Sequence, residues 1–491
     1  MNATAPDRPS SLLQQFRQSL SEGDTVSALQ SGLIGKSATI DGPYGVKRLI
    51  YADYVASGRA LMQIEQFVLE QVLPYYANSH TEASYCGGLM TRLRREARAM
   101  IADCCGANGE HAVIFAGSGA TAGLNRLVTL LGVTDAVAAG QRVRILIGPY
   151  EHHSNILPWR ESGADIVTIA EAPTGGPHLA ELAAALAVPA DLTICTLSAA
   201  SNITGIIADV EAITRLVKSS GAKMVWDYAG AGPYLPIAMS HGPDAQIDAL
   251  VVSPHKFIGG PAASGVLILR QDATAATKPC WPGGGTVKFV SPTGHDYSTS
   301  LEAREEAGTP DVIGDIRAAL AFIVKDALGA TAIGRRNAEL VQRARSAWNG
   351  VERLEMLGAQ KPQRLPIFSF RVKDGQGGYV HQQLVTRMLS DRFGIQARGG
   401  CACAGPYVHR LLSIDVEQSE RIRQAILSGD EMRKPGFVRL NLSVLLSDDD
   451  IDFILASVAR LAGDSGEHAH GYDVDASRAI FFPRTDERSA A

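Results

Sequence analysis

Seven short apolar runs recur between residues 111 and 270, and each is bounded by Gly, Pro or Ser. They are rich in β-branched residues and continuous rather than alternating, which is typical of strands buried on both faces of a parallel sheet. Amphipathic segments at 179–187 and 209–219 predict helices between some of them. The expected strands are residues 111–117, 143–148, 165–170, 192–198, 223–229, 249–254 and 265–270. The pattern indicates an α/β fold with a largely parallel seven-stranded sheet.

The order of elements changes after about residue 325. Residues 367–372 and 437–443 read as strands, 378–393 reads as a helix, and Ser447 is expected to cap a final helix with three aspartates in its first turn. This order predicts a smaller C-terminal α+β domain. The expected divisions are an N-terminal arm (1–48), the large domain (49–325), the small domain (326–463) and a polar tail (464–491).

The composition of the 491-residue chain is that of a globular protein, with 46% hydrophobic and 20% charged residues. A formal net charge of -5 gives no electrostatic reason to expect a nucleic acid or an anionic membrane as partner. No apolar stretch predicts a membrane span or a secretory signal, so the cytoplasm is the expected location. Seven cysteines without zinc-ligand spacing indicate neither a disulfide framework nor a metal site.

A carboxylate and an amine follow two of the expected strands. Asp227 ends the run at 223–227, and Lys256 follows the run at 249–252 within Ser-Pro-His-Lys. Ligands of open α/β sheets bind outside the carboxyl ends of strands. Lysine there can form an imine with pyridoxal phosphate, while the aspartate keeps the pyridine nitrogen protonated. A capping aspartate and a lysine that extends to solvent are the alternatives.

A glycine-rich turn follows the first strand. In residues 117–123, Gly119, Ala120 and Thr121 lie where a helix is expected to begin, and free amides at such a position bind phosphate. A tight turn without a ligand is the alternative. The loop precedes the Asp227 and Lys256 pair, which favours a phosphate site.

Two further polar groups follow expected strands. His152, in Glu-His-His-Ser-Asn, could lie on the pyridine ring and relay protons, or it could face solvent in a loop. Asn202 could donate to the phenolic oxygen of the cofactor, or it could be a turn residue.

The run 398–405, Arg-Gly-Gly-Cys-Ala-Cys-Ala-Gly, predicts a mobile loop with two thiols. Cys401 and Cys403 are poorly spaced for an unstrained disulfide, and cysteines in exposed loops are often reactive. A redox pair and incidental loop cysteines are the other readings. Arg439, in the expected strand at 437–443, is a candidate to bind a substrate carboxylate if it faces inward.

Taken together, these residues resemble the class V aminotransferase family of fold-type I pyridoxal phosphate enzymes, and within it the Suf-type cysteine desulfurases and selenocysteine lyases. The resemblance runs from Tyr51 to about Ala462. Residues 51–57 look like the family's opening strand, Ser253 to Lys256 match its Schiff-base motif, and Glu302 to Pro310 match its threonine loop.

The resemblance implies a role for each of these positions. His152 would stack on the ring, Asp227 would pair with its nitrogen, Arg439 would hold the substrate carboxylate, and Ser253 and His255 would join Thr121 at the phosphate. It implies a homodimer in which Thr309 reaches the partner's cofactor. Cys403, five residues after an arginine, falls at the position of the sulfur-accepting cysteine.

The resemblance therefore predicts a desulfurase that releases alanine from L-cysteine, leaves a persulfide on Cys403 and passes the sulfur to an acceptor protein. Three positions depart from the family pattern: Gly230 stands where many desulfurases have glutamine, Ala120 where threonine is common, and Gly-Cys-Ala-Cys where His-His-Cys is usual. These departures keep open a class V transaminase, lyase or epimerase that acts on another amino acid. A scaffold without turnover is the third hypothesis, and the paired Asp227 and Lys256 argue against it.

Overall fold

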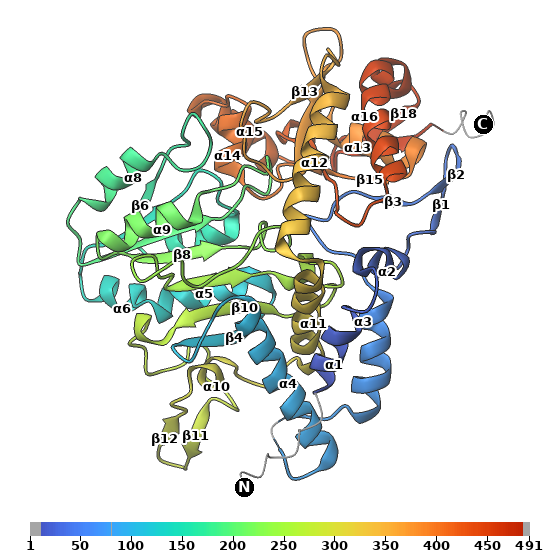
Figure 1. The fold of residues 1–491 in the computed structure, drawn as a ribbon. Coiled ribbons are helices and arrows are strands. Elements are labelled where there is room, and N and C mark those ends of the chain that lie inside the picture. The colour runs from blue at the N-terminus through green and yellow to red at the C-terminus, as the bar shows by residue number, and fades with distance from the viewer. Residues whose placement is uncertain (1–10, 80, 485–491) are drawn as a thin grey trace.

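The computed structural model describes residues 11–79 and 81–484. Its centre is a seven-stranded sheet covered by helices, and a smaller antiparallel sheet lies beyond it toward the C-terminus (Figure 1). In spatial order the large sheet contains β4 (His111–Gly117), β10 (Gly265–Arg270), β9 (Ala249–Val252), β8 (Lys223–Asp227), β7 (Leu192–Ser198), β5 (Val143–Ile147) and β6 (Asp165–Thr168).

The large sheet is mostly parallel, as the sequence predicts. Strands β9, β8, β7, β5 and β6 pair in parallel, and only β10 runs antiparallel to both of its neighbours, β4 and β9. Each of the seven strands lies where the apolar runs predict one. The fold class is therefore confirmed, and the carboxyl ends of β4, β9, β8, β7 and β5 lie at one edge of the sheet.

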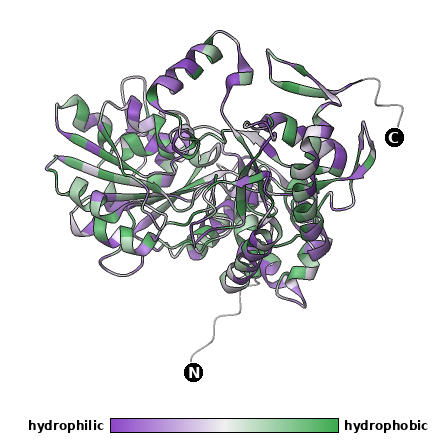
Figure 2. Cartoon of the chain, turned by 90° about the horizontal axis from the view of Figure 1, so that it is seen from above, coloured by the Kyte–Doolittle hydropathy of each residue, from purple (hydrophilic) through white to green (hydrophobic). Residues whose placement is uncertain are grey.

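Alternate side chains of the strands pack into two separate cores. On β9, Leu250 and Val252 join one core, while Ala249 and Val251 join the other. The first core is covered by α1 (Leu12–Ser19), α4 (Tyr85–Cys104), α8 (Leu179–Leu186), α9 (Val210–Ser219) and α11 (Val312–Leu328). The second is covered by α5 (Gly119–Leu130), α6 (Val133–Ala138) and α7 (Leu157–Glu161). Burial on both faces explains why the strands lack polar alternation (Figure 2).

The smaller sheet has the spatial order β13 (Leu354–Met356), β14 (Ile367–Val372), β17 (Phe437–Asn441) and β16 (Arg398–Gly400), and all its pairs are antiparallel. It packs with α12 (Ala330–Trp348), α13 (Gln382–Phe393) and α16 (Asp448–Ala469). Ser447 caps α16 as expected, because its Oγ accepts a hydrogen bond from the amide of Asp450. In the core beneath this smaller sheet, the rings of Trp348 and Phe368 meet edge to face.

The last helix runs past residue 463, where the small domain is expected to end. Helix α16 continues to Ala469, and the hairpin β18 (Tyr472–Asp475) and β19 (Ile480–Pro483) follows it. Glycine inside a helix costs only about 1 kcal/mol, so Gly463 does not end α16, whose next turn buries Ser465. Tyr472 and Phe481 of the hairpin are buried in the core of the smaller sheet.

The expected opening strand at residues 51–57 is shorter in the structure. Strand β3 (Ile50–Tyr51) ends before Asp53, where the chain turns with a hydrogen bond from Ala56 N to Asp53 O. It pairs in parallel with β15 (Ile395–Gln396), and Asn441 N donates to Ala52 O at 2.8 Å. This early segment is thus joined to strands that lie more than 340 residues later in the chain.

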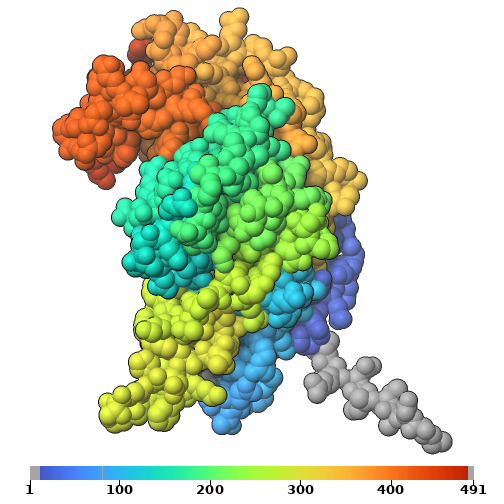
Figure 3. All heavy atoms as spheres, turned by 90° about the vertical axis from the view of Figure 1, so that its left-hand side faces the viewer, coloured from blue at the N-terminus to red at the C-terminus, as the bar shows by residue number. Residues whose placement is uncertain are grey.

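The remaining α-helices and strands lie outside the large and the smaller sheet, and some of them add buried side chains, such as Leu29, Ile64 and Leu301, to the two cores of the large sheet. They are α2 (Thr25–Ser31), β1 (Thr39–Gly42), β2 (Gly45–Arg48), α3 (Met62–Phe67), β11 (Val287–Val290), β12 (His295–Tyr297), α10 (Leu301–Glu305), α14 (Gly405–Leu411) and α15 (Val416–Leu427). Helices α14 and α15, in dark orange, project from the surface next to the teal and green residues of the large sheet region (Figure 3).

Candidate active site

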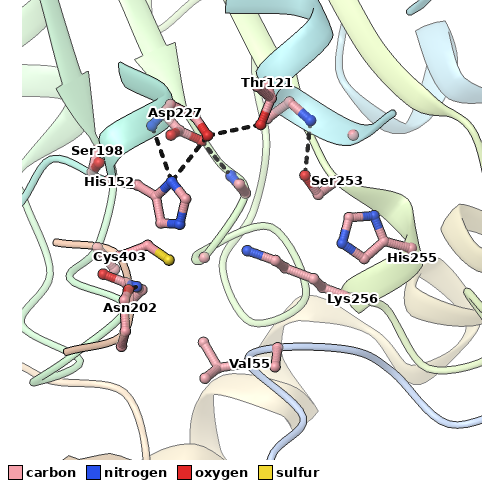
Figure 4. Close-up of a pocket in the computed structure, with 18 of the residues that line it drawn as sticks. Val55, Thr121, His152, Ser198, Asn202, Asp227, Ser253, His255, Lys256 and Cys403 are labelled. Atoms are coloured by element: carbon pink, nitrogen blue, oxygen red, sulfur yellow. Dashed lines mark hydrogen bonds between the residues drawn. The ribbon is translucent and has the colours of Figure 1, made fainter. Parts of the chain in front are cut away.

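A cavity of about 250 Å³ lies at the carboxyl ends of the parallel strands. Its wall comes from the loops after β7, β8 and β9, from the start of α5, from the segment after β3, and from the C-terminal region with Arg398, Cys403 and Arg439. The position agrees with the rule that open α/β sheets bind ligands at this edge. Most of the residues that the sequence singles out for chemistry therefore meet in one place (Figure 4).

Lys256 and Asp227 both line this cavity. Their strands are neighbours, since Asp227 of β8 pairs with Val251 of β9. Burial lowers the pKa of Lys256 to about 8, although the charge of Asp227 opposes this shift. Burial also raises the pKa of Asp227, and the hydrogen bond from Ala229 N at 2.7 Å and the charge of Lys256 offset it only in part. A reactive amine thus lies near a buried carboxylate whose negative charge is only partly neutralised by its surroundings, so it can bind a further positive group.

The start of α5 has the geometry of an anion site. Ser118 at the N-cap makes no side-chain capping bond, so the first amides of the helix are not satisfied by their own cap residue. Gly119 has φ of 63°, and a Cβ there would lie 3.0 Å from His255 Cε1 and 3.1 Å from Ser253 Oγ. Ser253 Oγ also accepts a hydrogen bond from Ala120 N at 2.9 Å. The helix start and the loop that carries Lys256 are therefore in close contact.

His152 lies in the cavity wall as a neutral imidazole. Burial lowers its pKa to about 4, and the charge of Lys256 lowers it further in the same direction. Ser154 N donates to His152 Nδ1 at 3.1 Å, which leaves the proton on Nε2. The Ser154 hydroxyl lies 2.7 Å from Thr121 Oγ1, and thereby connects His152 to the helix start. Burial also lowers the pKa of His255 to about 4, so both rings are uncharged near neutral pH.

Asn202 lines the cavity, but its amide nitrogen already has a partner. Nδ2 donates to Ala402 O of the cysteine loop at 2.9 Å. Its Oδ1 is buried and receives no hydrogen bond from any residue in the part of the chain that the structure describes. The expected contact between Asn202 and a cofactor oxygen remains a prediction, and the loop contact is an additional role that the sequence did not indicate.

The cysteine loop closes one side of the cavity. Cys403 is exposed and lines the wall, and its sulfur points into the space that Lys256 Nζ also enters (Figure 4). Cys401 is half-buried and belongs to the hydrophobic contacts around Tyr407 instead. The geometry thus distinguishes the two thiols, and the one in the cavity wall is Cys403, which the resemblance singles out.

Arg439 faces inward and is 3% exposed. Its Nη2 lies 2.9 Å from Asp53 Oδ1, and its Nη1 donates to Asn202 O at 3.2 Å. Arg398, which also lines the cavity, lies 3.0 Å from the other carboxylate oxygen of Asp53. The sequence reading missed this bridge, although Asp53 stands in the opening segment of the family and Arg398 directly precedes the thiol loop.

A second missed group lies below the cavity floor. Glu151 is buried and accepts hydrogen bonds from Ser198 N (2.9 Å), Ser198 Oγ (2.7 Å) and Asn155 Nδ2 (2.5 Å). Burial raises its pKa to about 7. Ser198 lines the cavity, so this network fixes the end of β7 against the loop that carries His152. The signal in the sequence was a charged residue four positions after the end of an apolar strand.

Thr309 is exposed and does not line the cavity that contains Lys256. Among residues 11–79 and 81–484 there is no group of three or more His, Cys, Asp or Glu side chains suited to a metal ion. Within the same ranges, no helix combines the length and the apolar character that a membrane crossing requires.

The donor set fits pyridoxal phosphate. The buried carboxylate of Asp227 can be neutralised by a protonated ring nitrogen, and the start of α5, where Ser118 makes no capping bond, can hold a phosphate. The amine of Lys256 has a pKa low enough to be substantially neutral near pH 8. These features define a site for an amine-linked, phosphorylated aromatic cofactor.

The comparisons with known proteins agree with this site. The aminotransferase class-V family matches residues 50–453, and the chain belongs to this family of pyridoxal phosphate-dependent enzymes. A probable cysteine desulfurase of Vibrio cholerae serotype O1 is 30% identical over 419 residues, which cover 84% of this chain and 93% of that protein. A cysteine desulfurase of Serratia proteamaculans is 28% identical over 429 residues, with 84% and 93% covered.

Solved structures show the same fold. The apo structure of a cysteine desulfurase from Thermococcus onnurineus NA1 has a TM-score of 0.69 at 24% identity and covers 84% of this chain and 95% of its own. A cysteine desulfurase from Escherichia coli, in an S-sulfonic acid form, has a TM-score of 0.69 at 20% identity, with 90% and 100% covered. The fold is therefore that of the fold-type I enzymes, as expected from the sequence.

Proposed function

We propose that this protein is a pyridoxal phosphate-dependent cysteine desulfurase that converts L-cysteine to alanine and carries the released sulfur as a persulfide on Cys403. The observation that carries the proposal is that the Cys403 sulfur and the Lys256 amine point into one cavity with Asp227 in its wall. Relatives named cysteine desulfurase, which align over most of the chain, support the same reaction.

The residues that would hold the cofactor have distinct tasks. Lys256 would link it covalently, Asp227 would keep its ring nitrogen protonated, and His152 would lie on the ring. Gly119, Ala120, Thr121, Ser253 and His255 would bind the phosphate, and Asn202 would face the phenolic oxygen. Bound pyridoxal phosphate supplies an electron sink for the bonds at the substrate's Cα.

The protein's own groups then act on the substrate. Arg439 would bind the carboxylate of L-cysteine, and the amine of Lys256, freed by the substrate, would move the proton at Cα. The Cys403 thiolate would attack the substrate sulfur. The carbon–sulfur bond breaks with its electron pair on carbon, which is then protonated, and Cys403 retains the sulfur. An exposed loop position suits the later transfer to an acceptor protein.

We also propose that the enzyme acts as a homodimer. Thr309 is exposed and outside the cavity wall of its own chain, which is compatible with a contact to the cofactor of a second copy. Large apolar side chains are exposed in two segments that precede it in the sequence, and they include Leu69, Tyr75, Tyr76, Tyr85, Trp281 and Phe289. Sedimentation of the purified protein tests this proposal, and a monomer at working concentration would contradict it.

The decisive experiment compares two cysteine variants. Cys403→Ser should retain the absorbance of bound cofactor and lose persulfide, measured by mass spectrometry after incubation with L-cysteine. The matched variant Cys401→Ser, two residues away, should retain both persulfide and alanine release. Undiminished alanine release by Cys403→Ser would rule out this mechanism. Lys256→Ala should lose the covalent linkage, seen as the absence of a borohydride-reduced peptide.

One observation favours a second candidate function. Gly230 lines the cavity without a side chain, and the Asn202 nitrogen is bonded to the loop, so side-chain donors toward the cofactor ring are few. A class V transaminase, lyase or epimerase for another amino acid would suit such a wall. A screen of amino acids for shifts in the cofactor absorbance separates the two, because a response to L-cysteine alone favours desulfuration.

A further inference from the structure

The loop that carries Cys403 is held at two points by one residue outside it. His153 N donates to Cys403 O at 2.8 Å. The imidazole of the same residue accepts a hydrogen bond at Nε2 from Gly405 N at 2.9 Å. These two contacts lie on either side of Ala404. His153 belongs to the loop after β5, so both contacts connect the large sheet region to the thiol loop.

The imidazole also supplies a cap that the loop itself lacks. Helix α14 begins at Gly405, and its N-cap residue Ala404 has no side chain that can accept a hydrogen bond. His153 Nε2 takes this place from outside the helix. A Cβ on Gly405 would lie 3.1 Å from His153 Nε2, so a larger residue would crowd the contact. The start of α14 is therefore stabilised by a residue more than 250 positions earlier.

The held conformation is a strained one. Ala402 and Cys403 have φ of 48° and 56°, and neither is glycine. Such residues cost about 1–2 kcal/mol each in the left-handed region, so a free loop would favour other conformations. Asn202 adds a third contact through its bond to Ala402 O at 2.9 Å. The position of Cys403 thus depends on contacts from His153 and Asn202 that offset backbone strain.

The His153 ring must be unprotonated to accept this bond. Burial lowers its pKa, and the charge of Arg160 on α7 lowers it as well. His152 lies beside it with a ring-centroid distance of 6.1 Å and is itself neutral. On its other side His153 lines a second, open cavity of about 560 Å³, together with Glu161. The ring therefore stands between this second cavity and the thiol loop.

We propose that His153 is a positioning residue that holds Cys403 at the cavity wall with its sulfur turned inward, and that loss of the Nε2 contact lets the loop move and makes the already exposed thiol more accessible. This role of His153 concerns the conformation of the loop and does not depend on which reaction the protein catalyses. The consequence for sulfur transfer rests on the proposed function, because a persulfide on Cys403 must turn from the cavity toward an acceptor protein. His153 then sets how often the loop opens.

The test measures alkylation of Cys403 by iodoacetamide in the cofactor-bound protein without substrate. A Cys401→Ser background leaves one thiol in the loop, and peptide mass spectrometry follows its modification at fixed pH. His153→Phe retains volume without an acceptor, and His153→Asn is too short to reach Gly405 N. Both should raise the alkylation rate roughly two- to tenfold, the factor that corresponds to one net hydrogen bond. His153→Gln restores an acceptor and should stay within about twofold of the background.

His409→Gln is the matched control. Its ring also contacts Gly405, but from within α14, with Nδ1 2.8 Å from Gly405 O, and it should leave alkylation unchanged. Unaltered rates in both His153→Phe and His153→Asn would overturn the proposal, as would a His153→Gln rate equal to that of His153→Phe. If alkylation follows the predicted order while no persulfide forms with L-cysteine, the proposed function fails and the positioning role stands.

Discussion

Arg439 and Asp53 form a buried ion pair, with Arg439 Nη2 2.9 Å from Asp53 Oδ1. Asp53 is 7% exposed, and its second oxygen pairs with Arg398. Two guanidinium groups at the cavity thus share one carboxylate, which leaves a net positive charge. A substrate carboxylate would meet an arginine that is already oriented by the protein.

Replacement of Asp53 by Asn should destabilise the protein. Arg439 would remain buried without its counter-charge, and breaking such a pair typically costs about 3–5 kcal/mol. Urea unfolding of the cofactor-free protein measures the change. The exposed pair of Glu417 and Arg421 on α15 serves as control, and Glu417→Gln should change the free energy of unfolding by less than about 1 kcal/mol. Equal effects of the two substitutions would contradict the role assigned to burial.

Cofactor uptake should depend on the protonation of Lys256. Burial lowers the pKa of its amine to about 8, so the neutral form that can attack an aldehyde predominates above that pH. The rate of pyridoxal phosphate uptake by the apo-protein, followed by stopped-flow absorbance, should rise with pH around a midpoint near 8. Lys256→Ala gives the background. A midpoint near about 10.4, the ordinary value for lysine, would show that the amine is not desolvated.

A methyl group at position 119 should weaken cofactor binding. Gly119→Ala adds a Cβ about 3 Å from His255 and Ser253 at a strained φ of 63°, so these two side chains or the start of α5 must give way. We expect the dissociation constant for pyridoxal phosphate to rise at least roughly tenfold, which corresponds to about 1.4 kcal/mol. Gly140→Ala is the matched control, because Gly140 also has a positive φ, 72°, but open space around its Cβ. Gly140→Ala should lower the free energy of unfolding but leave the dissociation constant for pyridoxal phosphate unchanged.

The buried carboxylate of Glu151 should make stability depend on pH. Its pKa is raised by burial to about 7, above the value of about 4.3 for an unfolded chain, so the folded state binds the additional proton between these values. The free energy of unfolding of the wild type should therefore fall as pH rises from about 4.3 to 7.

Glu151→Gln should lack this dependence. The free energy of unfolding of the wild type minus that of the variant should decrease by roughly 1–3 kcal/mol as the pH rises through the range between the two pKa values of Glu151. Urea unfolding at pH 5 and pH 8 measures it, with Glu22→Gln on the surface as reference. A constant difference at both pH values would show that Glu151 titrates at its ordinary pKa.

Much of the large sheet could be predicted because its strands are buried on both faces. Continuous apolar runs such as 192–198 and 265–270 have the bounds of β7 and β10 in the structure. Local sequence also indicated the cap at Ser447. The antiparallel direction of β10 was not predicted, because strand direction depends on pairing between distant segments rather than on local pattern.

The candidate site residues that the structure brings together are mainly those that follow a strand. Asp227, Lys256 and His152 lie together because parallel strands bring their carboxyl ends to one edge. The bridge from Asp53 to Arg398 and Arg439 could not be predicted, since its members come from opposite ends of the chain. The same holds for His153, whose contact with Gly405 spans 252 positions.

The pairing of β3 with β15 has a consequence for biosynthesis. Ile50 and Tyr51 leave the ribosome early, but their partners Ile395 and Gln396, and then Asn441, are translated some hundreds of residues later. At about 5–20 residues per second, the nascent N-terminal segment waits tens of seconds for these strands. A truncated polypeptide released before residue 395 therefore lacks both β15 and Asn441, whose Oδ1 accepts a hydrogen bond from the amide of Val55 in the cavity wall.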